Sequence, residues 1–493
     1  MNKLVTKIGA AAMSIVMASA CMLSAGNAFA AASPIAPLDN SVKMTFAAWG
    51  DPQVSTYIKS REPYVISSSN DLKNAQTNID ALVIAGDIAE NGNQAEYDIV
   101  YNNLVGTGVD NFITATGNHD VRRGEFSAIE STFVGFTNRL NADAGSALVI
   151  DSLHYSYDVN GYRFIVLGTE KSMYEEASIS TKQIKWLDSQ LADATKSGKP
   201  AFVVMHQVLK DTHGLPDTWG GFAEGAGTVG EQSDEIKAVL GKYTNVILIS
   251  GHLHTGLGKY SYEKIGNIHS INLPSIGVDN DMGTNNDNAT GYVAEVYEGK
   301  VIFRARNFEK GEYIPEYDIT IPLSKVKSIK ATSSFTYDGK TKSPKVTLTD
   351  FNGKKISSKN YTVKYPSGRK NVGTYQIKIT FKNSLKNDPV LTKEFTIVPA
   401  STSITGVASK SKGFTVKWKK QTNQTSGYQI EYSTDKKFAK SKTITIKSNA
   451  STGKTVSKLN AKKKYYVRIR TFKTVKGTRL CSSWSKTKSV TTK

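Results

Sequence analysis

Short apolar runs alternate with polar stretches through the first two thirds of the chain. Most of these runs end at a glycine or a polar residue, as fully buried strands do. They predict strands over 44–50, 80–86, 111–117, 162–168, 201–206 and 245–251. The stretch 178–199 instead has apolar residues at helical spacing (Ile184, Leu187, Leu191), and Ser180 with Gln183 forms a capping-box pattern at its start. The alternation predicts an α/β layered domain.

Helical periodicity stops near residue 324. Lys, Thr and Ser become frequent, and short alternating segments such as FTYDGK and TYQIKITF recur up to residue 398. A linker-like PAST at 399–402 precedes a second set of such segments, including FTVKWKK and KKYYVRIRTF. Short strands and turns at this spacing are typical of β-sandwiches. We therefore expect an α/β domain over 33–322 and two all-β sandwich modules over 324–398 and 402–493.

The first 30 residues have the pattern of an export signal. Two lysines precede an apolar stretch, and Ala28-Phe29-Ala30 offers a small-residue cleavage site. We expect cleavage after Ala30 and a secreted protein, extracellular or associated with the cell wall. A lipid anchor on Cys21 is the alternative, but the preceding Ala-Ser-Ala lacks the large aliphatic residue of a lipobox. No later apolar run reaches about 18 residues, so no transmembrane anchor is expected.

Composition divides the chain into an acidic and a basic part. Residues 321–493 contain 39 Lys and Arg against 6 Asp and Glu, while the rest contains 24 against 37. Such asymmetry favours separate domains with separate functions. Only Cys481 remains after the signal, so no intramolecular disulfide is possible. An exported chain so poor in cysteine is in keeping with a Gram-positive source.

Metal-binding side chains follow five of the predicted strands. In an open α/β sheet the carboxyl ends of the strands are where ligands bind, so we expect these side chains to meet. His252 and His254 lie two positions apart in ISGHLHT, where strand geometry would point both to one side. Imidazole, carboxylate and amide groups without thiolate suit Mn, Fe or Zn. The candidate ligands outnumber those of one tetrahedral ion, which favours two ions; they are Asp51, Gln53, Asp87, Asn118, His206, His252 and His254.

The order of these motifs resembles the calcineurin-like metallophosphoesterase superfamily over about 43–322. The resemblance implies a four-layer fold, a β-sandwich flanked by helices, and hydrolysis of a phosphoester substrate at a dinuclear site. It places Asp51, Asp87 and His254 on the first ion. Asp87 would bridge to a second ion, which Asn118, His206 and His252 complete. His119 then corresponds to the acid that protonates the leaving oxygen, with Asp120 orienting it.

Two positions depart from the pattern of the superfamily. Gln53 stands where most members have His, so the first ion could bind more weakly or differ in identity. Glu90 occupies a position where purple acid phosphatases have a Tyr ligand, which argues against that branch, and we assign Glu90 no role. Phosphomonoester and phosphodiester substrates both remain open.

The remaining histidines, and the arginines near the motifs, are weaker candidates for the site. We expect His154 and His269 to be structural, and Gln183 and Trp186 as well. His213 lies in a Gly-rich loop where substrate contact is an alternative, and Trp219 could line the mouth of the site. Two further side chains could hold a phosphate or simply lie in solvent; these are Arg122 and Arg123.

The basic part resembles extracellular β-sandwich modules. Residues 402–493 resemble a fibronectin type III domain, with Trp418 as core tryptophan, Tyr465 or Tyr466 at the tyrosine corner and Trp484 near the last strand. Residues 324–398 resemble a bacterial immunoglobulin-like module. The excess of lysine predicts retention on an anionic cell-wall polymer. Sequence-specific nucleic-acid binding is not expected. The alternative is a surface-binding or adhesion protein whose metal site is weak or inactive.

Overall fold

The computed structural model describes residues 33–219 and 227–493. The predicted signal peptide, with Cys21, lies outside these residues, and so do residues 220–226. Within the described residues no helix is long and apolar enough to cross a membrane.

The first sheet of the α/β domain contains three parallel strands: β1 (Met44–Trp49), β2 (Ala81–Ala85) and β3 (Phe112–Ala115). Four later strands extend it: β10 (Thr290–Val296), β11 (Lys300–Asn307), β12 (Glu312–Tyr313) and β13 (Ile319–Pro322). The strand order is β12-β11-β10-β1-β2-β3, and β13 pairs with β11. The later strands are antiparallel, so β1 pairs parallel with β2 on one side and antiparallel with β10 on the other.

The second sheet has the order β4-β5-β6-β7-β9-β8. Its strands are β4 (Tyr155–Val159), β5 (Tyr162–Val166), β6 (Ala201–Val204), β7 (Val246–Ser250), β8 (Tyr262–Ile265) and β9 (Ile268–Asn272). β5, β6, β7 and β9 run parallel. All six strands expected from the sequence are therefore present, three in each sheet.

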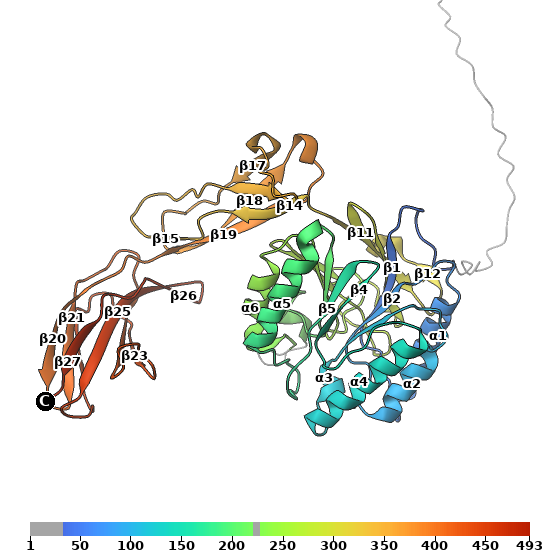
Figure 1. The fold of residues 1–493 in the computed structure, drawn as a ribbon, viewed down its shortest axis with the longest axis horizontal. Helices are drawn as coiled ribbons and strands as arrows, with labels where there is room; N and C mark the ends of the chain where they lie inside the picture. Colours follow the sequence, from blue (N-terminus) through green and yellow to red (C-terminus); the bar gives the residue numbers. More distant parts are fainter. Residues whose placement is uncertain (1–32, 220–226) are drawn as a thin grey trace, which may run out of the picture.

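The helices cover the outer faces of the two sheets (Figure 1). On the side of the first sheet lie α1 (Glu62–Lys73), α2 (Gln94–Leu104) and α4 (Phe126–Asp143), and the short α3 (Asn118–Val121) follows β3. On the side of the second sheet lie α5 (Thr181–Ala194) and α6 (Ser233–Leu240). Ser180 caps α5 as expected by accepting from the Gln183 amide at 3.2 Å. The Gln183 side chain, however, donates to Gly168 O and Glu170 instead of completing the box.

Successive side chains of the buried strands point to opposite faces of the sheet, and this explains the layers. Phe164 and Phe202 point into the core between the two sheets, where they pack against Phe46 of β1. Their neighbours Ile165 and Val203 point the other way, into a second core under α5 and α6. Both faces of these strands are therefore buried, which requires the continuous apolar runs seen in the sequence. The domain has the predicted four layers: helices, sheet, sheet, helices.

The basic part of the chain is entirely β in its regular structure, apart from single 3₁₀ turns. The strands of the first module are β14 (Val326–Lys330), β15 (Ser334–Thr336), β16 (Thr347–Asp350), β17 (Tyr361–Lys364), β18 (Gly373–Phe381) and β19 (Leu391–Val398). They form the sheets β14-β16 and β15-β19-β18-β17 over one core. The immunoglobulin-like assignment of this module stays a prediction.

The last module also has two sheets over one core. The first is β20-β21-β24, and the second is β23-β22-β25-β26 with β27 against β25. Trp418 and Tyr465 are buried in the core, as expected of a tryptophan and a corner tyrosine. Trp484 is only half-buried and lies outside this core, with the guanidinium groups of Arg468 and Arg470 over its ring at 4.8 and 4.2 Å. The strands are β20 (Ile404–Lys410), β21 (Gly413–Trp418), β22 (Gly427–Ser433), β23 (Lys442–Ile446), β24 (Gly453–Val456), β25 (Lys464–Val475), β26 (Thr478–Cys481) and β27 (Lys488–Thr491).

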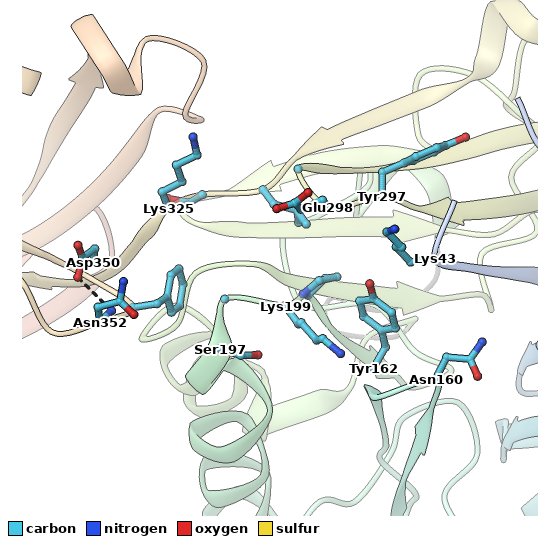
Figure 2. A pocket seen from close by; sticks show the side chains of 16 residues that line it. Lys43, Asn160, Tyr162, Ser197, Lys199, Tyr297, Glu298, Lys325, Asp350 and Asn352 are labelled. Atoms are coloured by element: carbon cyan, nitrogen blue, oxygen red, sulfur yellow. Dashed lines mark hydrogen bonds between the residues drawn. The ribbon is translucent and has the colours of Figure 1, made fainter. Parts of the chain in front are cut away.

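Hydrogen bonds join the α/β domain to the first β module. Asn245 exchanges two bonds with the backbone of Ser324, and Asn267 exchanges two with the backbone of Thr392. A cavity of about 1020 Å³ lies at this junction, with the Phe351 side chain in its wall. Figure 2 shows side chains from both sides of the junction around it, including Lys43, Lys199 and Lys325.

Candidate metal centre

The predicted ligands meet at the carboxyl ends of the parallel strands. Asp51 follows β1, Asp87 follows β2 and Asn118 follows β3, all in the first sheet. His206 follows β6, and His252 with His254 follow β7 in the second sheet. Because the two sheets pack face to face, the turns after these strands face one another. The site is thus assembled from segments up to about 200 residues apart, as the 3.1 Å bond from the His252 amide to Asp51 Oδ2 illustrates.

The backbone is strained where these side chains leave the strands. Asp51, Asp87 and His252 have left-handed φ values of 47°, 46° and 75°, although none of them is glycine. Non-glycine residues in this region cost about 1–3 kcal/mol each and are typical of functional sites. A side chain at Gly86 or Gly117 would occupy the site itself, since a Cβ there would lie 2.6 Å from His206 Nδ1 or 2.1 Å from Asp87 Oδ1.

Around His206, atoms with lone pairs converge on one point. The Nδ1–H group of His206 donates to Ala85 O at 2.7 Å, which leaves Nε2 as an acceptor in the neutral ring. Nε2 lies 3.1 Å from Asn118 Oδ1 and 3.1 Å from His252 Nδ1. It also lies 3.2 Å from Asp87 Oδ2. Acceptors at these distances repel one another unless a proton or a cation lies between them.

A second convergence shares the same aspartate. One ligand atom each from Asp51, Asp87 and His254 lies within 4.8 Å of the others, as do those of Asp87, His206 and His252. His254 Nε2 lies 3.2 Å from Asp51 Oδ1. Asp51, Asp87, His206 and His252 are all buried. Two neighbouring ligand clusters with Asp87 in common are the arrangement of a carboxylate-bridged pair of ions.

The pKa values of the cluster show how strongly its charges interact. Burial alone would lower the pKa of His206, but the carboxylates of Asp87 and Asp51 raise it to about 9. Burial together with the positive charge of His206 lowers the pKa of His252 well below its usual value. His206 thus takes up the proton that the converging acceptors require. A bound cation would replace that proton and satisfy the same acceptors.

Two buried polar atoms without a hydrogen-bond partner also fit a metal site. His252 Nε2 and Gln53 Oε1 are buried and have no hydrogen-bond partner among the described residues. Buried polar atoms are rarely left unpaired, because each costs about 1–3 kcal/mol. Imidazole nitrogen and amide oxygen are both metal ligands, so the residues present fit a site for cations of the Mn, Fe or Zn type.

Residues 44–256 match the family model of the calcineurin-like phosphoesterases. This segment is a calcineurin-like phosphoesterase domain. The match agrees with the geometry of the clusters, which brings ligands for metal ions together within this segment. Residues 398–486 match the fibronectin type III domain, which confirms the sequence-based interpretation of the last module.

Solved structures give more distant similarities. The purple acid phosphatase PPD1 from yellow lupin (Lupinus luteus) seeds is 15% identical with a TM-score of 0.39, covering 57% of this chain and 53% of that one. The FN1–FN3 domains of chicken CNTN1 are 18% identical with a TM-score of 0.20, covering 39% of this chain and 77% of that one. The chain therefore spans about half the length of the lupin phosphatase. No match was found among curated protein sequences.

In the phosphoesterase domain, Gln53 and His119 lie side by side. Gln53 Nε2 lies 3.1 Å from His119 Nε2 and 2.8 Å from Glu90 Oε2. The His119 ring is partly exposed and its Nδ1 donates to Glu90 O at 3.1 Å. Burial would lower the pKa of His119, but the hydrogen bond to Glu90 and the charge of Asp87 raise it above its ordinary value. The ring is therefore held in place and suited to carry a proton.

Glu90 has no role in the sequence-based interpretation, but in the structure it is the residue that holds His119. Its carboxylate also pairs with Arg61, which in turn donates to Gln53 O at 2.9 Å. Burial would raise the pKa of Glu90, but bonds from His119 and Arg61 lower it to about 2. The signal that could have found Glu90 is its place three residues after Asp87 in the turn that carries the bridging ligand.

Asp120 does not orient His119 as expected. Its carboxylate accepts from the backbone amides of Ile88, Ala89 and Gly117, at 3.2, 3.0 and 2.8 Å. It also accepts from the Tyr97 hydroxyl at 3.1 Å. Asp120 is fully buried, and burial with the nearby Asp87 charge raises its pKa to about 7. It joins the turn after β2 to the turn after β3, which is a structural role.

The other residues named from the sequence divide into structural and peripheral ones. His213 is buried, and its ring contacts Tyr260 O and Ser270 Oγ at 2.7 and 2.8 Å, so it is structural and does not line the site. His269 is buried against the Tyr262 hydroxyl at 2.9 Å. His154 packs edge-on against the ring of Trp186 at 5.1 Å.

Three residues border the metal centre or point away from it. Trp219 does line the centre, because its ring stacks on His252 at 4.5 Å. Arg122 lies beside the centre, 3.7 Å from Glu175, whereas Arg123 is exposed.

Proposed function

We propose that the chain is a secreted phosphoester hydrolase that uses two metal ions bridged by Asp87. The observation that carries this proposal is the sharing of one buried carboxylate by two ligand clusters. A phosphoester is anionic and repels hydroxide, so a pair of cations suits it better than one. The mixture of nitrogen and oxygen ligands supports Mn, Fe or Zn as the ions, and the substrate is a phosphomonoester or a phosphodiester.

The residues of the chain have two tasks in this reaction. When bound, the ions supply hydroxide at neutral pH and withdraw charge from the phosphoryl oxygens. Asp51, His254, Asn118, His206 and His252 would hold them together with Asp87. His119 holds a proton at the edge of the site and delivers it to the leaving oxygen. Such general acid catalysis contributes about 10²- to 10⁴-fold.

Hydrolysis assays test this proposal directly. The chain from residue 31 is stripped of metal, resupplied separately with Mn, Zn or Fe, and given p-nitrophenyl phosphate or bis-p-nitrophenyl phosphate. We expect turnover that depends on the metal and disappears in Asp87→Asn, and the preferred ester separates phosphatase from diesterase. Bound metal without turnover of either ester would favour the alternative of a surface-binding protein with an inactive site.

The basic β modules support a second part of the proposal, retention on an anionic polymer of the cell wall. The excess of 39 Lys and Arg over 6 Asp and Glu is confined to residues 321–493. Two lysines outside these residues, Lys43 and Lys199, lie with Lys325 around the cavity at the junction (Figure 2), which Glu298 and Asp350 also line. A surface of one sign attracts polyanions over distances comparable to the Debye length.

Retention is tested by sedimentation with poly(glycerol phosphate) immobilised on beads. Reversing the three exposed lysines Lys462, Lys463 and Lys464 to Glu should weaken binding, and about 1 M salt should abolish it because the Debye length falls to about 3 Å. The matched control reverses Lys182, Lys185 and Lys196, which are exposed on or beside α5. Equal loss in both variants would show that net charge alone matters and that the β modules are not the retention surface.

A further inference from the structure

The amide of Asn118 faces two different partners. Its Oδ1 lies 3.1 Å from His206 Nε2, within the cluster of lone pairs. Its Nδ2 donates to Glu175 Oε2 at 2.9 Å and also faces Tyr174 O at 3.4 Å. The side chain is buried, so its orientation is set by these neighbours and not by water.

Which end of the amide faces the cluster decides whether Asn118 can bind a cation. Rotation by half a turn exchanges the carbonyl oxygen with the NH₂ group, which has nearly the same shape. Only the oxygen has lone pairs for a metal, whereas the NH₂ group would present two partial positive charges. A carboxylate is an acceptor only, so Glu175 requires the NH₂ group on its own side. The oxygen must then point toward His206.

Glu175 is itself held in place. It belongs to the connection between β5 and α5, outside every motif of the sequence. Its backbone oxygen accepts from Gln207 Nε2 at 3.1 Å, which ties it to the residue after His206. Its other carboxylate oxygen lies 3.7 Å from Arg122. The connection therefore reaches both the turn after β3 and the turn after β6, which carry Asn118 and His206 of the Asp87–His206–His252 cluster.

We propose that Glu175 is a positioning residue that fixes the Asn118 amide with its oxygen toward the ion of the Asp87–His206–His252 cluster. The inference rests on the proposed dinuclear function. Partners of metal ligands typically contribute about 10- to 100-fold to metal affinity. The loss of Glu175 should affect one ion selectively, because Asn118 Oδ1 lies 3.1 Å from His206 Nε2, a ligand atom of the Asp87–His206–His252 cluster.

The test measures metal binding to the chain itself, without substrate. Metal-stripped full-length protein is dialysed against a series of Mn²⁺ concentrations, and bound Mn²⁺ is counted. Wild type should bind two ions. Glu175→Ala should keep the tighter ion and bind the other about 10- to 100-fold more weakly. Glu175→Gln should recover part of the loss, since its amide oxygen can accept from Asn118. The matched control is Glu176→Ala, whose carboxylate lies beside Gly230 instead.

The same Glu175 substitution made in the Asn118→Asp variant separates a positioning role from a general structural role. Asp at position 118 has two acceptor oxygens and needs no orienting partner, but it would face the Glu175 carboxylate across the present 2.9 Å contact. Glu175→Ala should therefore raise Mn²⁺ affinity in Asn118→Asp, the opposite of its effect in wild type. A residue needed only for folding would lower affinity in both backgrounds.

The outcomes distinguish this inference from the function on which it rests. If wild type binds no pair of ions, the proposed function fails. If wild type binds two and Glu175→Ala binds two with unchanged affinity, or weakens both equally, the positioning role alone is overturned. Circular dichroism of each variant checks the fold, and Glu175→Gln, which preserves size and hydrogen bonding, carries the test if Glu175→Ala does not fold.

Discussion

Replacing Asp120 by Asn should destabilise the phosphoesterase domain far more than the small chemical change implies. Oδ1 accepts from the Ala89 amide and the Tyr97 hydroxyl, and Oδ2 accepts from the Gly117 and Ile88 amides. An Asn side chain has one acceptor oxygen, so in either orientation its NH₂ group faces two donors. Two buried donors lose their acceptor at about 1–3 kcal/mol each, a cost of about 2–6 kcal/mol. Burial and the neighbouring Asp87 charge raise the pKa of Asp120 to about 7, so removing the Asp120 charge offsets part of this cost and the net loss is smaller.

The Tyr97→Phe variant provides a reference for this loss of unfolding free energy. Tyr97→Phe removes one donor and leaves Asp120 with its three backbone partners, so we expect a loss of about 0.5–1.5 kcal/mol. Urea unfolding followed by far-ultraviolet circular dichroism measures both variants. The six α-helices of the described residues all lie between 62 and 240, so the helical signal reports on this domain alone. EDTA in all samples removes any contribution from metal binding.

The result that would refute this reasoning is specific. If Asp120→Asn unfolds at the same urea concentration as wild type but loses turnover while metal content is unchanged, then Asp120 acts on His119 after all. The hydrogen bonds to the two turns would then be dispensable, contrary to the structural role that we assign to this carboxylate.

Two further predictions concern His119 and His269. His119→Asn should reduce kcat by about 10²- to 10⁴-fold with Mn²⁺ content unchanged, because the ring delivers a proton and binds no ion; loss of metal in this variant would make it a ligand instead. Burial, reinforced by Lys264, lowers the pKa of His269 to about 3 from 6.5. The unfolded state therefore binds a proton that the folded state does not, and stability should fall by about 2 kcal/mol between pH 7 and pH 5 through this group. Urea titrations of wild type and His269→Gln at both pH values should differ by that amount, and parallel pH profiles would contradict the assignment.

The strands and the metal ligands could be predicted from the sequence because both depend on local pattern. A buried strand requires an apolar run, and Asp87 or His252 is recognisable as the first polar residue after such a run and a glycine. The helices α1, α2 and α4 were not singled out, since their apolar faces are narrow and contain polar residues such as Ser68 and Asn141, which are buried.

Contacts between distant segments could not be predicted. Glu175 reaches Asn118 across 57 residues and lies in a connection without any motif. Asp120 is adjacent to His119 in sequence, but helix α3 turns its side chain toward the backbone of the neighbouring loop. His213 lies seven positions after His206, yet its ring points into the domain toward Ser270. In each case the direction of a side chain, and not its position in the sequence, decides the role.

The central claim is a pair of ions bridged by Asp87, and electron paramagnetic resonance of Mn²⁺-loaded protein tests it most directly. Wild type should bind two Mn²⁺ per chain and give the spectrum of a magnetically coupled pair. Asp87→Asn should lose that coupling together with turnover, because the shared carboxylate belongs to both clusters. Two uncoupled ions in wild type, or a coupled pair that persists in Asp87→Asn, would contradict the bridged site.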